Sequence, residues 1–280
     1  MIGDQGARYQ PGVLAHFGWP MRISFLSVLR PFAALGVAAF IVFIGWSFVA
    51  YRAMPEARAA LRGDDRIAVE RGEGYWLFQP KSASGVGLLF FPGALVDPAA
   101  YAPLAREVAQ RGYPVLLIEL PWRGAFGAAD WPDVFVRAHD AMRRAPAVHR
   151  WVIAGHSRGG GVAARMVLSD PSNIAGLVLI GTSHPRDLNL AHVLLPVTKV
   201  YGTRDTVVGA DALQQTSGNL PPATRMVEID GGNHSQFGYY GFQPGDSAAT
   251  IPRETQQRLT RQALTDALDA ARSSSAGKRS

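Results

Sequence analysis

The five residues Gly155–Gly159, which read GHSRG, have the spacing of a nucleophilic turn. An apolar run, Trp151–Ala154, leads into them, and a stretch with helical spacing follows. On a sharp turn between a strand and a helix, a serine hydroxyl is exposed for attack, and glycines two positions before and after it avoid a collision across the turn. The pattern predicts Ser157 as a nucleophile. The plainer alternative is a glycine-rich turn that happens to contain serine.

A base and an acid in the right chain order follow this turn. A serine hydroxyl is a weak nucleophile unless a base lies within hydrogen-bond reach and a third group orients that base. Asp205 follows the apolar run Val197–Tyr201, and His234 follows the run Arg225–Ile229. Because the carboxyl ends of strands in an open parallel sheet line one crevice, we expect Ser157, Asp205 and His234 to converge there.

Each of these two residues has a plainer explanation when it is met singly. Asp205 would be a solvated turn residue, and His234 would be a histidine on a surface loop. Their order after the turn favours catalysis instead. Asp211 and Asp230 are the alternative acids, less well placed for the loop geometry.

Two backbone N–H groups are expected to stabilise the negative oxygen that forms during attack. One belongs to Arg158, directly after the serine, and the other to Ala94, where the neighbouring Gly93 allows close backbone approach. We expect the Arg158 side chain to lie on the helix flank in solvent, with contact to an anionic substrate as the alternative. His156 is expected to be a structural part of the turn, and His184 to line the pocket or to face water.

Composition narrows the chemistry further. The chain has no cysteine, which excludes a disulfide, a thiolate metal site and a cysteine nucleophile. It has no HExxH or similar set of closely spaced ligands, so we expect no catalytic metal and no cofactor. A serine on the turn argues against enzymes that use a carboxylate nucleophile, such as haloalkane dehalogenases and epoxide hydrolases. The net charge of +6 comes from thinly spread arginines without interleaved aromatics, so we expect no nucleic-acid partner.

Short apolar strands alternate with helical patterns after residue 66, which predicts an α/β domain with a mostly parallel sheet flanked by helices. The expected strands are Tyr75–Gln79, Val86–Phe91, Pro114–Leu120, Trp151–Ala154, Leu177–Gly181, Val197–Tyr201 and Arg225–Ile229. The expected helices are Pro98–Arg111, Pro132–Arg144, Arg158–Leu168 and Arg253–Ala271.

The connection between Gly181 and Pro196, about a dozen residues, is too short for a helical lid. We therefore expect a minimal cap or none and an open cleft for small or exposed acyl groups. Its walls are expected from Pro121–Asp130, Ser183–Leu194 and Phe237–Thr250.

An uncharged stretch, Phe32–Tyr51, precedes the domain and is long enough to cross ~30 Å of hydrocarbon as a helix. It predicts a single-pass membrane anchor in contact with lipid; a cleaved signal peptide and a buried core helix are the alternatives. Its orientation stays open, because the arginine count places the C-terminal domain inside while an ordinary anchor has its N-terminus inside. Met21 is an alternative start to Met1.

The expected organisation has five parts. They are an N-terminal tail (1–31), a transmembrane anchor (32–51), a linker (52–66), a catalytic domain (67–271) and a disordered tail (272–280).

Several stretches together resemble the dienelactone-hydrolase-like branch of the α/β-hydrolase superfamily, alpha/beta hydrolase family 5. They are Phe91–Pro98, Ala100–Ala105, Gly155–Gly160, Tyr201–Asp205, Gly231–Gly238 and Tyr240–Asp246. The resemblance covers the chain from about Met54 to its end, and members often have an N-terminal membrane segment. Two departures, Arg158 in place of a more usual leucine and Leu120–Gly124 in place of a more apolar segment, affect the pocket wall.

The resemblance implies the α/β-hydrolase fold and a serine hydrolase that cleaves an ester, thioester or lactone bond of a small molecule through an acyl-enzyme. Two other functions stay open. An acyltransferase would pass the same acyl group to an alcohol or amine, and a non-catalytic membrane-anchored module would keep the fold for binding only.

Overall fold

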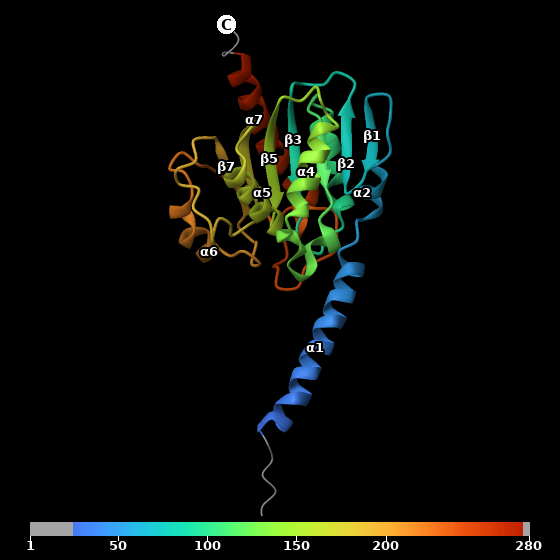
Figure 1. Cartoon of the computed structure of the whole chain (residues 1–280), viewed down its shortest axis with the longest axis vertical. Coiled ribbons are helices and arrows are strands. Elements are labelled where there is room, and N and C mark those ends of the chain that lie inside the picture. The colour runs from blue at the N-terminus through green and yellow to red at the C-terminus, as the bar shows by residue number, and fades with distance from the viewer. Residues whose placement is uncertain (1–24, 277–280) are drawn as a thin grey trace, which may run out of the picture. The chain divides into compact units, whose positions relative to one another are not determined.

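The computed structural model describes residues 25–276, and the chain divides into two units, Met1–Val42 and Phe43–Ser280 (Figure 1). The proposed tail of residues 1–31 and the question of Met1 or Met21 as the start lie largely outside the described residues, as do residues 277–280. Helix α1 (Phe25–Ala50) crosses the boundary between the units, and its last turns, from Phe43, belong to the larger one.

The larger unit is built on one eight-stranded sheet in the order β1-β2-β4-β3-β5-β6-β7-β8. The edge strands β1 and β2 pair antiparallel, as do β2 and β4, and all other pairs are parallel. The strands are β1 (Ile67–Gly72), β2 (Tyr75–Pro80), β3 (Val86–Phe91), β4 (Val115–Ile118), β5 (Arg150–His156), β6 (Ile174–Ile180), β7 (Val197–Gly202) and β8 (Arg225–Ile229).

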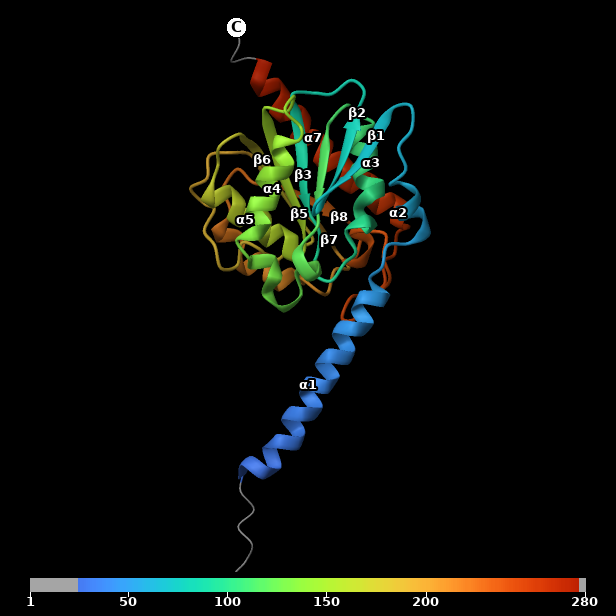
Figure 2. The same cartoon turned by 45° about the vertical axis from the view of Figure 1, so that its right-hand side comes forward.

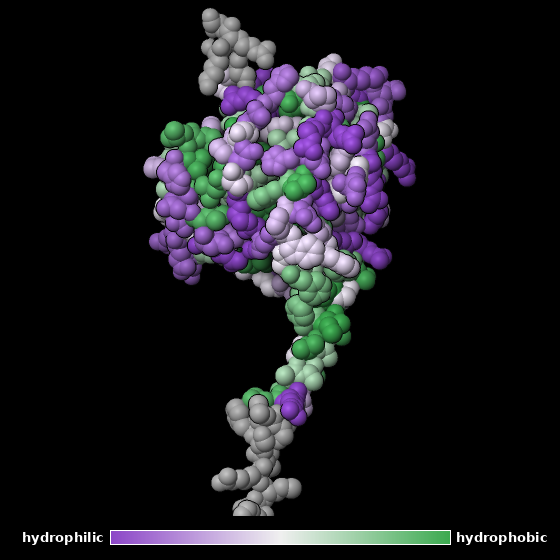
Figure 3. Space-filling model, viewed as in Figure 1, coloured by the Kyte–Doolittle hydropathy of each residue, from purple (hydrophilic) through white to green (hydrophobic). Residues whose placement is uncertain are grey.

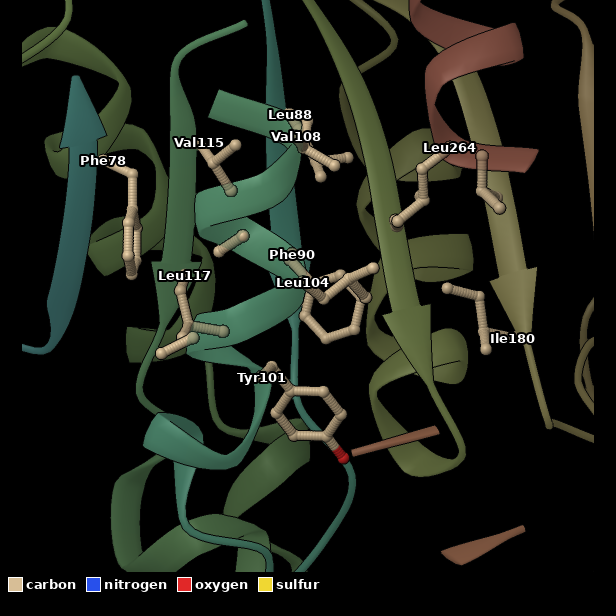
Figure 4. Packing of buried hydrophobic residues seen from close by; sticks show 14 of the residues in the cluster. Phe78, Leu88, Phe90, Tyr101, Leu104, Val108, Val115, Leu117, Ile180 and Leu264 are labelled. Atoms are coloured by element: carbon tan, nitrogen blue, oxygen red, sulfur yellow. The ribbon is translucent and has the colours of Figure 1, made fainter. Parts of the chain in front are cut away.

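Helices cover both faces of this sheet, so its central strands are apolar on both sides (Figures 1 and 2). The main helices are α3 (Ala102–Ala109), α4 (Asp133–Arg143), α5 (Arg158–Ser169) and α7 (Arg253–Ala276). Strand β3 shows the alternation. Leu88 and Phe90 pack with Leu104 of α3 and Leu264 of α7 (Figure 4), while Leu89 and Phe91 point to the face covered by α4 and α5.

Short elements fill the connections. They are α2 (Pro55–Ala59), η1 (Pro98–Tyr101), η2 (Pro121–Asp130), α6 (Ala210–Gln215), η3 (Ser217–Asn219) and η4 (Ser235–Phe237). No helix lies between β6 and β7, so the connection of residues 181–196 forms no helical cap. The fold class that the sequence predicted, a mostly parallel sheet between helices with a minimal cap, is confirmed.

Helix α1 is apolar on all sides, and the large apolar side chains along it are exposed. Its stretch Leu29–Ala50 is long and apolar enough to cross a membrane, although a signal sequence near an N-terminus meets the same criteria. Because so little of the stretch is buried, α1 is not a core helix of a soluble domain. Figure 3 shows this apolar colouring of α1 and the mostly hydrophilic face of the domain.

Three segments differ from the expected organisation. Residues 52–66, expected to be a linker, contain α2, and Ala53 and Ala57 are buried against the domain. Strand β1 was not anticipated and adds an antiparallel edge. Helix α7 continues to Ala276, so residues 272–276, expected to be disordered, are helical.

Candidate active site

Ser157 lies on the turn between β5 and α5 with backbone angles φ 52° and ψ −121°. Left-handed backbone is strained for any residue other than glycine, and such strain persists only where the surroundings fix it. Here the close packing around Gly155 and Gly159 fixes the backbone of Ser157. A Cβ on Gly155 would lie 2.2 Å from the backbone oxygen of Gly159, and a Cβ on Gly159 would lie 2.2 Å from that of Phe91. The sequence thus folds into the sharp turn that its glycine spacing predicts.

His234 and Asp205 meet at the carboxyl ends of β8 and β7. His234 Nδ1 lies 2.8 Å from Asp205 Oδ2, and both side chains are buried. A carboxylate only accepts hydrogen bonds, so Nδ1 donates and the lone pair of the neutral ring is on Nε2. His234 Nε2 is buried and has no hydrogen-bond partner among the described residues.

The loops that carry this pair are joined to each other. The Arg204 N–H donates to the Gly232 oxygen at 2.8 Å, and a Cβ on Gly202 would lie 2.3 Å from the same oxygen. This backbone contact holds the two strand ends together. The alternative acids do not take part: Asp211 is exposed on α6, and exposed Asp230 accepts a bond from Thr203.

Asp246 and Gln256 hold the loop of His234 from outside. Asp246 accepts the N–H groups of His234 (3.2 Å) and Ser235 (2.8 Å) and the Ser235 hydroxyl (2.7 Å). Gln256 of α7 accepts the N–H of Asn233 at 3.0 Å and donates to its oxygen at 2.7 Å. Because these groups are buried, the bonds fix the backbone on both sides of the histidine.

His156 links the nucleophilic turn to the histidine and to the loop of Ala94. Its ring lies 4.5 Å from the ring of His234, centroid to centroid. The Tyr101 hydroxyl accepts from the Gly93 N–H (3.0 Å) and forms a second hydrogen bond with His156 Nδ1 (2.8 Å), in which the tautomer of the ring sets the donor. Burial, and then the neighbouring His234, hold the pKa of His156 well below its usual value. His156 therefore stays neutral beside the second histidine.

The N–H groups proposed for the oxyanion form no hydrogen bond within the described part of the chain. Gly93 donates to Tyr101, and Leu95 donates to the Arg123 oxygen at 2.6 Å. Within residues 25–276 no acceptor is found for the N–H of Ala94 or for that of Arg158. Of the three consecutive amides in this loop, Ala94 is the one left to face a ligand.

The side chains of Arg158 and His184, near the site, are each held by an aspartate. The Arg158 guanidinium pairs with Asp130, at the end of η2, so it does not project freely into solvent. His184 is buried against Gly161 of α5, with Nδ1 3.0 Å from Asp187, so it does not face water. In the part of the chain that the structure describes, no three His, Asp or Glu side chains are grouped as a metal site.

Sequence reasoning assigned no role to Tyr101, Asp246 or Gln256. Tyr101 and Asp246 lie inside stretches that carry the family resemblance, and that was the only available signal. Gln256 forms part of an ordinary helical pattern. Its two bonds to Asn233 depend on how α7 packs beside the loop after β8, which spacing along the chain does not reveal.

Known proteins share the fold and part of the sequence. A protein of Mycobacterium phage D29 named as a non-heme haloperoxidase is 26% identical over 120 residues, which is 39% of this chain and 42% of that protein. The chain thus matches less than half of this relative's length.

Two solved structures have the same architecture. The dienelactone hydrolase of Anabaena variabilis superimposes with a TM-score of 0.55 at 20% identity, over 72% of this chain and 99% of that one. A hydrolase of Thermoplasma acidophilum gives a TM-score of 0.52 at 19% identity, over 71% and 99%. At these identities the likeness concerns the fold.

A family model gives the assignment. Residues 87–258, from β3 into α7, match the model of the alpha/beta hydrolase family, and this range includes Ser157, Asp205 and His234. The matched residues make up more than half of the chain. With the sheet order, the strained turn and the strand-end loops described above, the chain belongs to the alpha/beta hydrolase family.

Proposed function

We propose that the protein is a serine hydrolase that cleaves a carboxylic ester, thioester or lactone through Ser157, His234 and Asp205. One observation carries the proposal. The buried Nε2 of His234 is unpartnered while Nδ1 is held by Asp205, and the His234 ring lies 4.5 Å from the ring of His156, which directly precedes Ser157 on the strained turn. A buried, unpaired nitrogen costs free energy, and a catalytic base that must receive a proton is a reason to retain it.

The reaction follows from this arrangement. Ser157 Oγ attacks the carbonyl carbon while His234 Nε2 takes the hydroxyl proton, and the carbonyl oxygen becomes an oxyanion held by the N–H groups of Ala94 and Arg158. When the oxyanion collapses, His234 gives its proton to the leaving alcohol, thiol or hydroxyl, and the acyl group stays on Ser157. Water then repeats the two steps and releases the carboxylic acid. Asp205 stays ionised throughout and holds the ring in the required tautomer.

We also propose that α1 is a retained single-pass membrane anchor. The end of α1 is part of the domain, which supports retention over cleavage. Ser47 and Tyr51 are buried, and the ring of Tyr51 packs on the ring of Tyr240 at 5.7 Å between centroids. The backbone carbonyl oxygen of Tyr51 accepts the Asp97 N–H at 2.9 Å. Removal of a signal peptide after the apolar stretch would strip residues from this core. N-terminal sequencing of the mature protein, with alkaline carbonate extraction of membranes, tests this. A mature chain that begins after Ala50 contradicts it.

The hydrolase is tested on the full chain in detergent micelles with a fluorophosphonate probe and with the p-nitrophenyl esters of acetate, butyrate and octanoate. We expect labelling and turnover that Ser157→Ala lowers by at least about a thousandfold. A folded wild-type protein that neither labels nor turns over an ester contradicts the proposal and favours the binding module. Faster product formation with added alcohol, together with a new ester product, identifies acyl transfer.

A further inference from the structure

Three aromatic side chains are exposed at the carboxyl edge of the sheet, where the candidate site lies. We call them the aromatic rim: Trp122 and Phe126, each 66% exposed on η2, and Phe242, 57% exposed on the segment between η4 and α7. Exposed apolar side chains that gather on one part of a surface mark sites that contact a partner or a membrane. The apolar side chains Trp46 and Val49, on the last turns of α1, are exposed as well.

Each segment of the rim is bonded to one half of the site. On the η2 side, the Arg123 oxygen accepts the Leu95 N–H, beside Ala94. On the other side, the Gln243 N–H donates to the Ser235 hydroxyl at 3.0 Å, beside His234. The two segments of the rim are therefore tied to the loops that carry Ala94 and His234.

Both segments also contact the end of α1. The Arg123 side chain donates to the Phe48 oxygen at 3.0 Å and lies over the Phe48 ring at 4.9 Å. On the other side, a Cβ on Gly241 would lie 2.6 Å from the Ala50 oxygen. The last turn of an anchor helix marks the water-facing boundary of the bilayer, and residues in contact with that turn are held at the same level by the chain itself.

The backbone of η2 is strained at both aromatic residues of the rim that it carries. Trp122, Arg123 and Phe126 have φ values of 48°, 51° and 54°, which are unfavourable for residues other than glycine. The buried residues Ala125 and Ala129 and the bonds of Arg123 hold this conformation. Such strain clusters at functional segments, and here it coincides with two exposed aromatic side chains.

We propose that the aromatic rim lies in the headgroup region of the bilayer that holds α1, so that the site opens onto the lipid surface and takes an ester-bearing amphiphile from it. Trp and Tyr are enriched at this depth, and amphipathic or aromatic surfaces bind there. Exposed Arg52, just past the helix end, is placed to meet lipid phosphates. The substrate class rests on the proposed hydrolase, and the location of the rim rests on α1 as an anchor.

Depth is measured first, because it does not depend on activity. The chain has no cysteine, so Trp122→Cys, Phe242→Cys and Leu194→Cys each create a single labelling position. Leu194 is the matched control: it is fully exposed and, although the sequence placed it at the end of an expected cleft wall, it lies near the start of β7, at the amino edge of the sheet. Each full-length variant, labelled with an environment-sensitive dye, is reconstituted in vesicles of phosphatidylcholine and phosphatidylglycerol with spin-labelled lipid.

We expect lipid quenching at positions 122 and 242 that exceeds quenching at position 194 by at least about threefold. Equal quenching at all three positions overturns the proposal. A mature protein from which α1 has been cleaved, and which no longer co-sediments with the vesicles, overturns it as well.

Substrate preference is measured second. Trp122→Ser combined with Phe242→Ser should lower hydrolysis of a vesicle-borne ester about tenfold relative to water-soluble p-nitrophenyl butyrate. Leu194→Ser should leave that ratio unchanged. An unchanged ratio in the double variant overturns the substrate class. If the wild type is inactive on every ester, the proposed hydrolase fails, while the quenching result still decides whether the rim lies in lipid.

Discussion

Replacing Tyr101 with phenylalanine should test how the two halves of the candidate site are held together. The Tyr101 hydroxyl is the one atom that bonds both the Gly93 N–H, at 3.0 Å, and His156 Nδ1, at 2.8 Å. Burial keeps the pKa of Tyr101 above its usual value, so the hydroxyl stays protonated and can donate at any physiological pH. Phenylalanine keeps the ring packing and removes only this link.

The cost follows from the groups left unpaired. Gly93 and His156 would each keep a buried polar atom without a partner, at about 1–3 kcal/mol apiece. We expect Tyr101→Phe to lower the free energy of unfolding by about 2–4 kcal/mol. The loop of Ala94 would also lose its tie to the nucleophilic turn, so the rate of fluorophosphonate labelling and kcat should fall about 10- to 100-fold, with KM little changed.

Tyr113→Phe is the matched control. The Tyr113 residue is as buried as Tyr101, but its hydroxyl donates to exposed Asp269 of α7 in a part-buried bond, so its loss should cost about 1 kcal/mol. Tyr113 immediately precedes β4 at the amino edge of the sheet, and Tyr113→Phe should keep the wild-type labelling rate and kcat. Thermal unfolding and labelling kinetics of the three proteins decide the matter. If Tyr101→Phe unfolds earlier but labels within about twofold of the wild type, Tyr101 has no positioning role.

Three further substitutions test other parts of the argument. Asp205→Asn offers the histidine an N–H in place of an acceptor, which favours the wrong tautomer, and kcat for ester hydrolysis should fall about a thousandfold or more. Burial lowers the pKa of Lys199 from 10.5 to about 8. Between these pH values the unfolded chain therefore binds more protons than the folded one. The free energy of unfolding should rise by about 3 kcal/mol as the pH increases from 8 to 10.5. Lys199→Met should abolish this rise and unfold at a higher temperature than the wild type at pH 7; an equal rise in both proteins contradicts the burial argument. Gly159→Ala places a Cβ 2.2 Å from the backbone oxygen that ends β3 and should cost at least about 3 kcal/mol by thermal unfolding, whereas Gly218→Ala, with no atom within 4 Å, should be nearly neutral.

The central strands could be predicted from the sequence because a strand that is buried on both faces has a short, almost continuous apolar run. Val86–Phe91 and Arg225–Ile229 begin and end where the pattern predicts. The exposed edge strand β1, with the sequence IAVERG, carries charges on its open side and gives no such run. Helix α6 buries no residue at all and was missed for the same reason.

The geometry around the predicted catalytic residues depends on contacts that spacing does not encode. The order Ser157, Asp205, His234 follows from strand-end loops, and a search for residues after apolar runs can find it. The support from Asp246 arises from a chain segment that folds back over η4, which no periodicity predicts. The left-handed backbone of Trp122 was also unpredictable, since neither that residue nor its neighbours favour it.

Segment 52–66 connects the helix end to the domain in a way that matters for the site. Asp97, just beyond the loop of Ala94, accepts the Ala53 N–H at 3.3 Å and pairs with Arg58 at 2.7 Å. Because the Arg58 side chain is 54% exposed, that pair contributes at most about 1 kcal/mol. Burial of Ala53 and Ala57 contributes more to holding the segment, and the Arg106 side chain of α3 fixes its continuation by donating a hydrogen bond to the Ala60 oxygen at 3.1 Å. A flexible spacer would let the domain rotate freely about the helix, whereas this packed segment joins the helix end to the loop that is expected to hold the oxyanion.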